Sequence, residues 1–451
     1  MATKDAAKEA VMGIAKEYGF IQPSSLDEIG RIDPALRREV EESMLAKDKK
    51  IGHSIITSNA RFVFELLQNA DDNQFGRALA RNELPFIAFH AFSDRIIVEC
   101  NEDGFTKENL SAICSVGEST KAASHGYIGA KGIGFKSVFI AARKVEIQSG
   151  NYTFYFKHDR EDLGLGMVLP VWQDVGDSVP DFLTRITLHL HQKGDPDEIQ
   201  HLHQTIFRQL DDLEETCLLF LRNLKEIRRF YLEGDSSWKV SLNKVSVEKD
   251  GKESVQSREY YVSRYMGSGL PRSENRELPA TAEAQRASAQ AETVLAFPAT
   301  QDNCPILEPQ SVFAFLPIRK TTFKFLIQSD FDTNASRQDV SLTSRRNAHL
   351  RDHVASAFCQ AVLGFTSDKD FSYKWPAYLP SLEEAAGTFW ADLPRKILAQ
   401  LSRHAVIRTR HNRLQPIADV VIPTLDFKGS DGNVFLDHPD IDPFISDHYS
   451  T

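Results

Sequence analysis

Cysteine is scarce in this chain, and the few cysteines present exclude two common structural roles. The 451 residues include five cysteines, and no two of them have C-x-x-C spacing. An odd, scattered set provides neither the paired framework of a small disulfide-stabilised domain nor a zinc-binding motif. The pattern is typical of reduced thiols inside a cell. The five are Cys100, Cys114, Cys217, Cys304 and Cys359.

Long apolar runs and an excess of basic residues are also missing. No apolar run reaches the roughly 20 residues that a membrane-spanning helix needs, and the N-terminus lacks a signal-peptide core. The formal net charge is -10, whereas nonspecific binding to nucleic acid needs a basic surface. We therefore expect an intracellular protein, cytoplasmic or nuclear, that binds no membrane and carries no strong nucleic-acid signal.

The composition that remains fits a globular protein of more than one domain. Hydrophobic residues make up 41% and charged residues 26% of the chain, which are ordinary values. The length predicts two or three domains. We place a helical extension at 1–50, one domain at 51–235 and another at 236–451, with a mobile polar loop near 267–290. The chain ends without an obvious closing element, so we expect a longer protein of which this is the N-terminal part.

Apolar periodicity predicts the order of the elements along the chain. Helices are expected at 4–18, 35–47, 59–82, 106–117, within 197–234, 344–365 and 393–403. Strands are expected at 86–92, 95–100, 144–148, 152–157, 184–191, 238–247, 260–265, 312–318, 323–331 and 419–423. The basic pair Arg345 and Arg346 is interpreted as a solvated helix start.

The helix expected over 59–82 carries an unusual polar stripe. Glu65, Asn69 and Asp72 follow one another at i, i+4 and i+7, so they lie along one face of the helix. On an isolated helix such a stripe is most simply the face turned to water. A functional interpretation of this stripe depends on the segments that follow it in the sequence.

A glycine cluster precedes an apolar helical stretch at 125–142, HGYIGAKGIGFKSVFIAA. Glycines allow close backbone approach, and free N–H groups at a helix N-terminus favour an anion. The spacing is neither that of a P-loop nor that of a dinucleotide-binding turn. Lys131 and Lys136 lie in this cluster, and two interpretations stay open for them: one of them contacts phosphate, or both face water.

Together, three segments resemble the GHKL superfamily of ATPases. The segments occur in the same order as the motifs of that superfamily: FELLQNADDN, GFTKENLSAICSVGESTK and GYIGAKGIGFKSVF. Their amino-acid sequences are most similar to the chaperone-like module of the NO VEIN and sacsin proteins. The resemblance implies an α/β fold, an α+β sandwich, with a Bergerat-type ATP-binding domain at 51–235. Weaker similarity to the ninety-kilodalton heat-shock chaperone continues at 184–190 and 331–340. It implies that 236–451 is a second α/β domain that resembles the start of the middle domain of that chaperone.

The resemblance also implies roles for individual residues. Glu65 falls on the general base that polarises the attacking water. Asn69 falls on the ligand of Mg²⁺, and Asp72 on a supporting acid beside it. Thr184 falls on the threonine behind the adenine, Lys121 on a lid lysine that contacts phosphate. The loop that wraps the phosphates falls on Gly129, Lys131, Gly132, Ile133, Gly134 and Phe135.

Two departures from the family pattern concern the residue that recognises adenine and the length of the lid. The adenine-reading aspartate of the family aligns with Cys100, so we expect Asn101 or Asp103 to supply the acceptor. Only residues 122–125 separate Lys121 from Gly126, which makes the lid very short.

The last implied residue is Arg337, in the segment DTNASRQDV. It matches an arginine that reaches the γ-phosphate, a role that suits the fixed donors of a guanidinium. The alternative is an arginine that pairs with Asp332 or Asp339 in its own loop.

The implied function is an ATP-binding, slowly ATP-hydrolysing chaperone-like module that uses ATP/ADP and Mg²⁺. It would couple nucleotide state to the conformation of a larger protein, with protein clients or further domains of a longer chain as partners. The alternative is a scaffold or sensor that binds nucleotide without hydrolysing it. Histidine-kinase activity is disfavoured because no dimerising helix with a phosphoacceptor histidine is recognisable.

Overall fold

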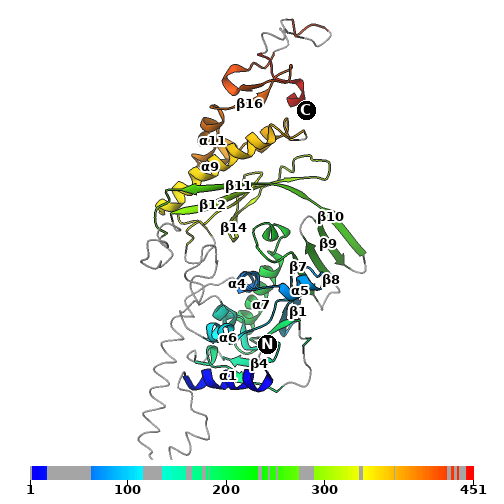
Figure 1. Ribbon diagram of the computed structural model, residues 1–451, viewed down its shortest axis with the longest axis vertical. Helices are drawn as coiled ribbons and strands as arrows, with labels where there is room; N and C mark the ends of the chain where they lie inside the picture. The colour runs from blue at the N-terminus through cyan, green and yellow to red at the C-terminus, as the bar shows by residue number, and fades with distance from the viewer. Residues whose placement is uncertain are drawn as a thin grey trace, which may run out of the picture. The chain divides into compact units, whose positions relative to one another are not determined.

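The chain has a mixed α/β fold in two units, Met1–Gln256 and Ser257–Thr451, each with its own main sheet (Figure 1). This agrees with the α+β class expected from the sequence. The computed structural model describes residues 3–17, 62–114, 135–158, 165–174, 179–180, 182–231, 236–241, 244–249, 252–273, 289–334, 339–369, 371–423, 428–430, 434–435 and 443–450.

The first unit is built on a ten-stranded sheet with the order β10-β9-β8-β7-β1-β2-β6-β3-β4-β5. All neighbouring pairs with a defined register are antiparallel except β1 and β7, which are parallel. The strands are β1 (Phe86–Ala91), β2 (Arg95–Cys100), β3 (Ala142–Ser149), β4 (Tyr152–Lys157), β5 (Val171–Trp172), β6 (Thr184–Leu190), β7 (Glu226–Tyr231), β8 (Ser236–Ser241), β9 (Lys244–Lys249) and β10 (Lys252–Ser257).

Period-two alternation fixes the orientation of the central strands. In β2, Ile96, Val98 and Cys100 are buried, while the residues between them are half-buried on the opposite face. The strands expected at 86–92 and 95–100 are confirmed and form a hairpin, because β2 pairs antiparallel with β1 from Ile87 to Ala91. One face of the sheet therefore belongs to the core, and the other carries charged and aromatic side chains.

The start of one helix in the first unit, α6, follows from its local sequence. In α6, Thr106 Oγ1 accepts from the Asn109 N–H and Asn109 Oδ1 accepts from the Thr106 N–H, a reciprocal N-terminal cap. After the glycine cluster the chain forms a 3₁₀ turn, shorter than the helix expected there. The helical elements are α1 (Lys4–Glu17), α4 (Phe62–Asp71), α5 (Gly76–Ala80), α6 (Lys107–Cys114), η1 (Phe135–Ile140), η2 (Leu165–Met167), α7 (Pro196–Asp211) and η3 (Glu215–Leu219).

Strands β8, β9 and β10 extend the first sheet beyond β7. β8 pairs antiparallel with β7, and β9 pairs antiparallel with β8. The sequence places a second domain from residue 236, whereas these strands lie in the unit that ends at Gln256. The stretch 238–247, expected as one strand, contributes to two.

The second unit is built on a five-stranded sheet with the order β11-β12-β15-β13-β14. Helix α9 (Arg345–Phe365) packs against β11 and β12, as Figure 1 shows. Its buried residues recur at helical spacing, and Phe297 of β12 contacts the rings of Phe358 and Phe365. The strands are β11 (Glu259–Ser268), β12 (Gln290–Ala299), β13 (Ser311–Ala314), β14 (Leu316–Lys320) and β15 (Leu326–Gln328).

Three details of this sheet differ from the sequence prediction. β12 was not expected, although it lies between β11 and β15. The stretch 312–318 is two antiparallel strands that turn at Phe315, whose φ is 64°. The expected pairing of 312–318 with 323–331 is confirmed, because β13 pairs with β15 in parallel. The polar loop expected near 267–290 overlaps β11 and β12 at its ends, and 274–288 lie outside the described residues.

The chain after α9 forms small elements. The predicted helix at 393–403 is confirmed as α11. The stretch 419–423, expected as a strand, begins at the last residue of a 3₁₀ turn and contains an isolated bridge from Val421 to Phe444. These elements are η4 (Trp375–Tyr378), α10 (Leu382–Ala385), α11 (Leu393–Leu401), β16 (Ala405–Arg408), β17 (Leu414–Pro416), η5 (Ile417–Asp419) and η7 (Asp447–Ser450). Across the described parts of the chain, no helix combines the length and apolarity needed to cross a membrane.

Candidate functional site

Helix α4 presents the polar stripe that the sequence singles out. The helix packs against η1 and α7, and its apolar residues are buried. Glu65 is only 8% exposed, while Asn69 and Asp72 are half-buried. The stripe is therefore not simply a solvated face. A carboxylate this far out of water suits a general base better than an exposed one does.

Asp71, which sequence reasoning missed, anchors the end of α4. Its carboxylate is fully buried and accepts the backbone N–H groups of Arg222, Asn223 and Leu224 at 2.8–3.1 Å. The Asn223 side chain returns a bond to the Asp71 carbonyl at 2.7 Å. These bonds tie α4 to the chain that enters β7, and so fix where Glu65 and Asn69 lie.

The segment after β2 divides its polar residues among different tasks. Asn101 Oδ1 accepts from Phe86 N at 2.8 Å, and its Nδ2 donates to Leu84 O at 3.0 Å. The Asp103 carboxylate accepts the N–H groups of Gly76 and Arg77 at the start of α5. Both residues expected as the adenine acceptor thus bind backbone groups.

Glu102, between them, is the carboxylate that faces Thr184. Thr184 Oγ1 donates to Glu102 Oε1 at 2.6 Å, and Ser149 Oγ lies 2.6 Å from Thr184 Oγ1. Ser149 Oγ accepts from Phe105 N at 2.9 Å. Because the Thr184 hydroxyl donates its hydrogen bond to Glu102, the hydroxyl of Ser149 must be the donor to Thr184. The three side chains form a hydrogen-bonded series that ends on the Glu102 carboxylate.

This buried chain of hydrogen bonds follows from the sheet register. Thr184 opens β6 and pairs with Cys100 on one side and Ser149 on the other. Glu102, Ser149 and Thr184 are each at most 4% exposed. The sequence signal was available in part: Thr184 was singled out, but nothing in NEDGF says which polar residue points toward it.

Cys100 connects this network with the end of α4. Burial raises the pKa of the Cys100 thiol well above its usual value, with Glu102 and then Asp71 adding in the same direction. The Asp103 N–H also donates to Gln74 O, in the turn that follows α4. The segment after β2 is therefore linked to the turn that follows α4 through this backbone bond.

Lys136 does not face water, which excludes the interpretation that both lysines do so. Lys131 lies outside the described residues, so the contact of one lysine with phosphate stays a prediction. Lys136 is 2% exposed, its Nζ donates to Met167 O, and it lies 4.7 Å from the centroid of the Phe156 ring. Burial lowers the pKa of Lys136 to about 8. A lysine enclosed in this way secures η1 against the segment of η2.

Several residues assigned from the resemblance lie outside the described residues. Phe135 is half-buried at the start of η1. The structure gives no position for the rest of the phosphate loop, the lid lysine or the arginine of the second unit. These are Lys121, Gly129, Lys131, Gly132, Ile133, Gly134 and Arg337.

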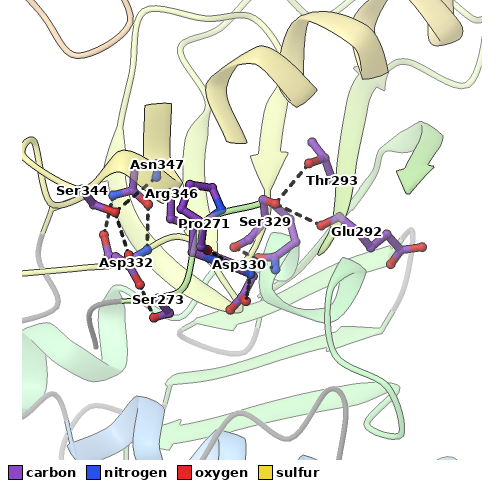
Figure 2. Close-up of polar contacts among 11 residues, drawn as sticks. Pro271, Ser273, Glu292, Thr293, Ser329, Asp330, Asp332, Ser344, Arg346 and Asn347 are labelled. Atoms are coloured by element: carbon purple, nitrogen blue, oxygen red, sulfur yellow. Dashed lines mark hydrogen bonds and ion pairs between the residues drawn. The ribbon is translucent and has the colours of Figure 1, made fainter. Parts of the chain in front are cut away.

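The second unit holds a separate polar cluster at the start of α9, shown in Figure 2. Arg346 was expected in water, yet it is 2% exposed, and its guanidinium donates to Asp330 Oδ2 at 2.8 Å and to Pro271 O at 2.9 Å. Asp339 binds Arg319 at 2.8 Å, and Asp332 accepts from Ser344 at 2.7 Å.

Comparison with known proteins gives one clear relationship. No family model matches the chain. Protein NO VEIN of Arabidopsis thaliana is 30% identical over 431 residues, which cover 88% of this chain and 15% of that protein. The chain is similar to NO VEIN along most of its length. This supports a NO VEIN-like relationship, with the chain spanning about 15% of its relative.

A solved structure gives a weaker likeness. It is described as the crystal structure of the N-terminal domain of a DNA repair protein, with 11% identity and a TM-score of 0.37. The match covers 67% of this chain and 93% of that chain. At that TM-score the likeness carries no argument about fold or function.

Proposed function

We propose that this NO VEIN-like chain binds ATP and hydrolyses it slowly, as a chaperone-like module that couples nucleotide state to the conformation of a larger protein. The observation that carries the proposal is the buried bond from Thr184 to Glu102 at 2.6 Å, together with the nearly buried Glu65 of α4. The motifs that resemble GHKL ATPases supply the rest of the argument.

In this proposal Glu102 reads the base, in place of Asn101 or Asp103. An ionised carboxylate only accepts hydrogen bonds. Adenine offers a donor, its exocyclic amine, where guanine has a carbonyl acceptor. Glu102, oriented by Thr184, therefore favours adenine over guanine.

Asn69 and Glu65 divide the phosphate chemistry between them. The Asn69 amide oxygen suits Mg²⁺, which prefers oxygen ligands and is shared with phosphates. Glu65, nearly buried, polarises the water that attacks the γ-phosphate. Arg337 then stabilises charge on the transferred phosphoryl group. Protein clients or further domains would respond to the change from ATP to ADP.

Calorimetric titration with ATP, ADP and GTP, with and without Mg²⁺, tests the site. We expect ATP and ADP to bind and GTP to bind at least about 10-fold more weakly. Glu102→Gln replaces one acceptor by a donor, so it should weaken ATP binding by about 10- to 100-fold and reduce the preference over GTP.

Glu99→Gln is the matched control for that variant. Glu99 lies on β2, three residues before Glu102, but its carboxylate binds Arg185 and His90 on the opposite face. Its loss should leave nucleotide affinity unchanged. Equal ATP affinity in wild type and Glu102→Gln would remove Glu102 from the site, and no binding of any nucleotide would contradict the proposed function.

A further inference from the structure

Gln68 is a polar side chain in the middle of α4, on the helix that carries Glu65 and Asn69. It is fully buried, and within the part of the chain that the structure describes neither its Oε1 nor its Nε2 has a hydrogen-bond partner. Nearly all buried polar side chains of native proteins are hydrogen-bonded, because an unpaired buried amide costs free energy. The amide of Gln68 therefore needs a partner that the described residues do not supply.

A second buried side chain of the same helix is fully paired. Asp71 lies three residues after Gln68 and is equally buried, yet its carboxylate accepts three consecutive backbone N–H groups. The chain that enters β7 thus supplies donors to Asp71, whereas Gln68 receives none from the described residues. A buried amide whose acceptor and donors are all unpaired suits a small polar molecule as its partner.

Helical geometry places Gln68 at the edge of the polar stripe. Residues three or four apart lie on one face of a helix, with Cβ atoms about 5–6 Å apart. Gln68 therefore lies beside Glu65 in one direction and beside Asp72 in the other, and the bond from Asp72 N to Gln68 O at 3.0 Å continues the helical pattern. Side chains at this separation can share one water molecule, because each hydrogen bond to it is about 2.8 Å long.

Water matches the groups that Glu65 and Gln68 offer. It has two O–H donors and two lone pairs. The Glu65 carboxylate, as the proposed general base, accepts from one O–H, and Gln68 Oε1 accepts from the other. With both hydrogens held by α4, a lone pair of the water points away from the helix, while Gln68 Nε2 stays available to donate to a phosphoryl oxygen. A glutamine also orients the attacking water in other nucleotide hydrolases.

We propose that Gln68 orients the attacking water that Glu65 activates. The inference rests on the proposed function. In the reaction the water oxygen forms a bond to the γ-phosphorus, and the bond from that phosphorus to the bridging oxygen breaks, its electron pair leaving with ADP. One proton of the water passes to the Glu65 carboxylate. Gln68 keeps its covalent bonds and its protons and contributes through orientation.

Gln68→Met tests this role in the whole chain. Methionine has a similar length but can neither orient water nor donate to a phosphoryl oxygen. We expect kcat at saturating Mg-ATP to fall by about 10- to 100-fold and ADP affinity to stay unchanged. The urea denaturation midpoint should stay equal or rise, because an apolar group replaces an unpaired amide. A lower kcat that comes with weaker ADP binding and a lower midpoint would indicate a structural role and contradict the inference.

Gln68→Ala and Gln209→Met are the matched variants. Gln68→Ala removes the same amide with the residue that a helix tolerates best, and it should lower kcat to a similar extent. Gln209 is half-buried on α7, outside the stripe, and its buried Oε1 also lacks a partner among the described residues. Gln209→Met makes the same exchange of side chains there and should leave kcat unchanged.

A double-mutant cycle with Glu65→Ala tests whether the two residues hold one water. In single-turnover measurements, Gln68→Met should lower the rate little further in the Glu65→Ala background, because the water is no longer held. An equal loss in both backgrounds, or an unchanged kcat in Gln68→Met and Gln68→Ala, contradicts the role of Gln68 and leaves the proposed function intact. A wild-type chain that binds ATP without turnover contradicts the proposed hydrolysis, and this inference with it.

Discussion

Three carboxylates around the end of β2 differ in what their oxygens accept. Asp71 accepts three consecutive backbone N–H groups, and Asp103 accepts two at the start of α5. Both bind groups of the fold itself. Glu102 instead accepts a hydroxyl that is oriented by a second hydroxyl. Under the proposed function, Glu102 is the one of the three that is assigned to the base.

At this scale Asp71 gives a stability prediction. Asp71→Asn keeps the shape but replaces a charged acceptor by an amide whose NH₂ faces backbone donors. We expect a loss of about 2–3 kcal/mol in the free energy of unfolding, measured by urea denaturation. Asp94→Asn is the control, because Asp94 is exposed and pairs with Arg95 at the surface. Equal stability of both variants would show that the bonds of Asp71 contribute little.

The sequence allowed the residues of α4 to be found, but not the partner of Thr184. Spacing alone puts Glu65, Asn69 and Asp72 on one face of a helix. The residues of NEDGF follow directly after strand β2, and the path of the backbone decides which of the polar side chains points inward. That path depends on α5, whose N–H groups donate hydrogen bonds to Asp103. It also depends on the backbone groups of Leu84 and Phe86, which form hydrogen bonds with the Asn101 side chain.

At the scale of the elements, two carboxylates join neighbouring strands on the face of the first sheet that carries charged and aromatic side chains. Glu99 of β2 binds His90 of β1 and Arg185 of β6. Glu146 of β3 lies 3.4 Å from His189 of β6 and also binds Lys144. Each carboxylate holds strands together through charge-assisted bonds.

These carboxylates predict loss of stability in acid. The pKa of Glu99 is lowered to about 2 by His90 first and then Arg185, and that of Glu146 to about 2 by His189 and then Lys144. The ordinary value is 4.5. A depressed folded-state pKa contributes stability that is complete above 4.5 and is lost as pH falls toward 2.

Urea denaturation at pH 6, 4 and 3 measures the effect. The midpoint should fall steeply below pH 4.5 in wild type and less steeply in the double variant Glu99→Gln, Glu146→Gln. Partial exposure of both pairs limits the size of the difference. The same slope in both proteins would assign the acid sensitivity to other groups.

Elements with a strong local signal were predicted, and those fixed by long-range pairing were not. The hairpin of β1 and β2, the cap of α6 and the length of α9 follow from alternation, a Thr106–Asn109 box and Ser344. β12 was missed because its alanines, a glutamate and Pro298 give little strand signal. It forms because β11 and β15 pair with it on both sides.

At the scale of the molecule, two units with separate sheets carry different parts of the proposed reaction. The first unit holds Glu65, Asn69, Glu102 and Thr184 in its described residues. Arg337, which the proposal assigns to the transferred phosphoryl group, belongs to the second unit in the sequence and lies outside the described residues. The relationship to NO VEIN spans both units, since it covers 88% of the chain. The account therefore predicts that a chain cut after Gln256 binds ADP but loses turnover.

Steady-state hydrolysis of Mg-ATP by the whole chain, compared between wild type and Glu65→Ala, tests the central claim most directly. We expect slow turnover in wild type and a loss of about 10²–10⁴-fold in the variant, with ATP affinity nearly unchanged. Glu108→Ala, which removes an exposed carboxylate on α6, should hydrolyse ATP at the wild-type rate. Turnover that persists unchanged in Glu65→Ala, or wild-type protein that binds ATP without hydrolysing it, would contradict the account.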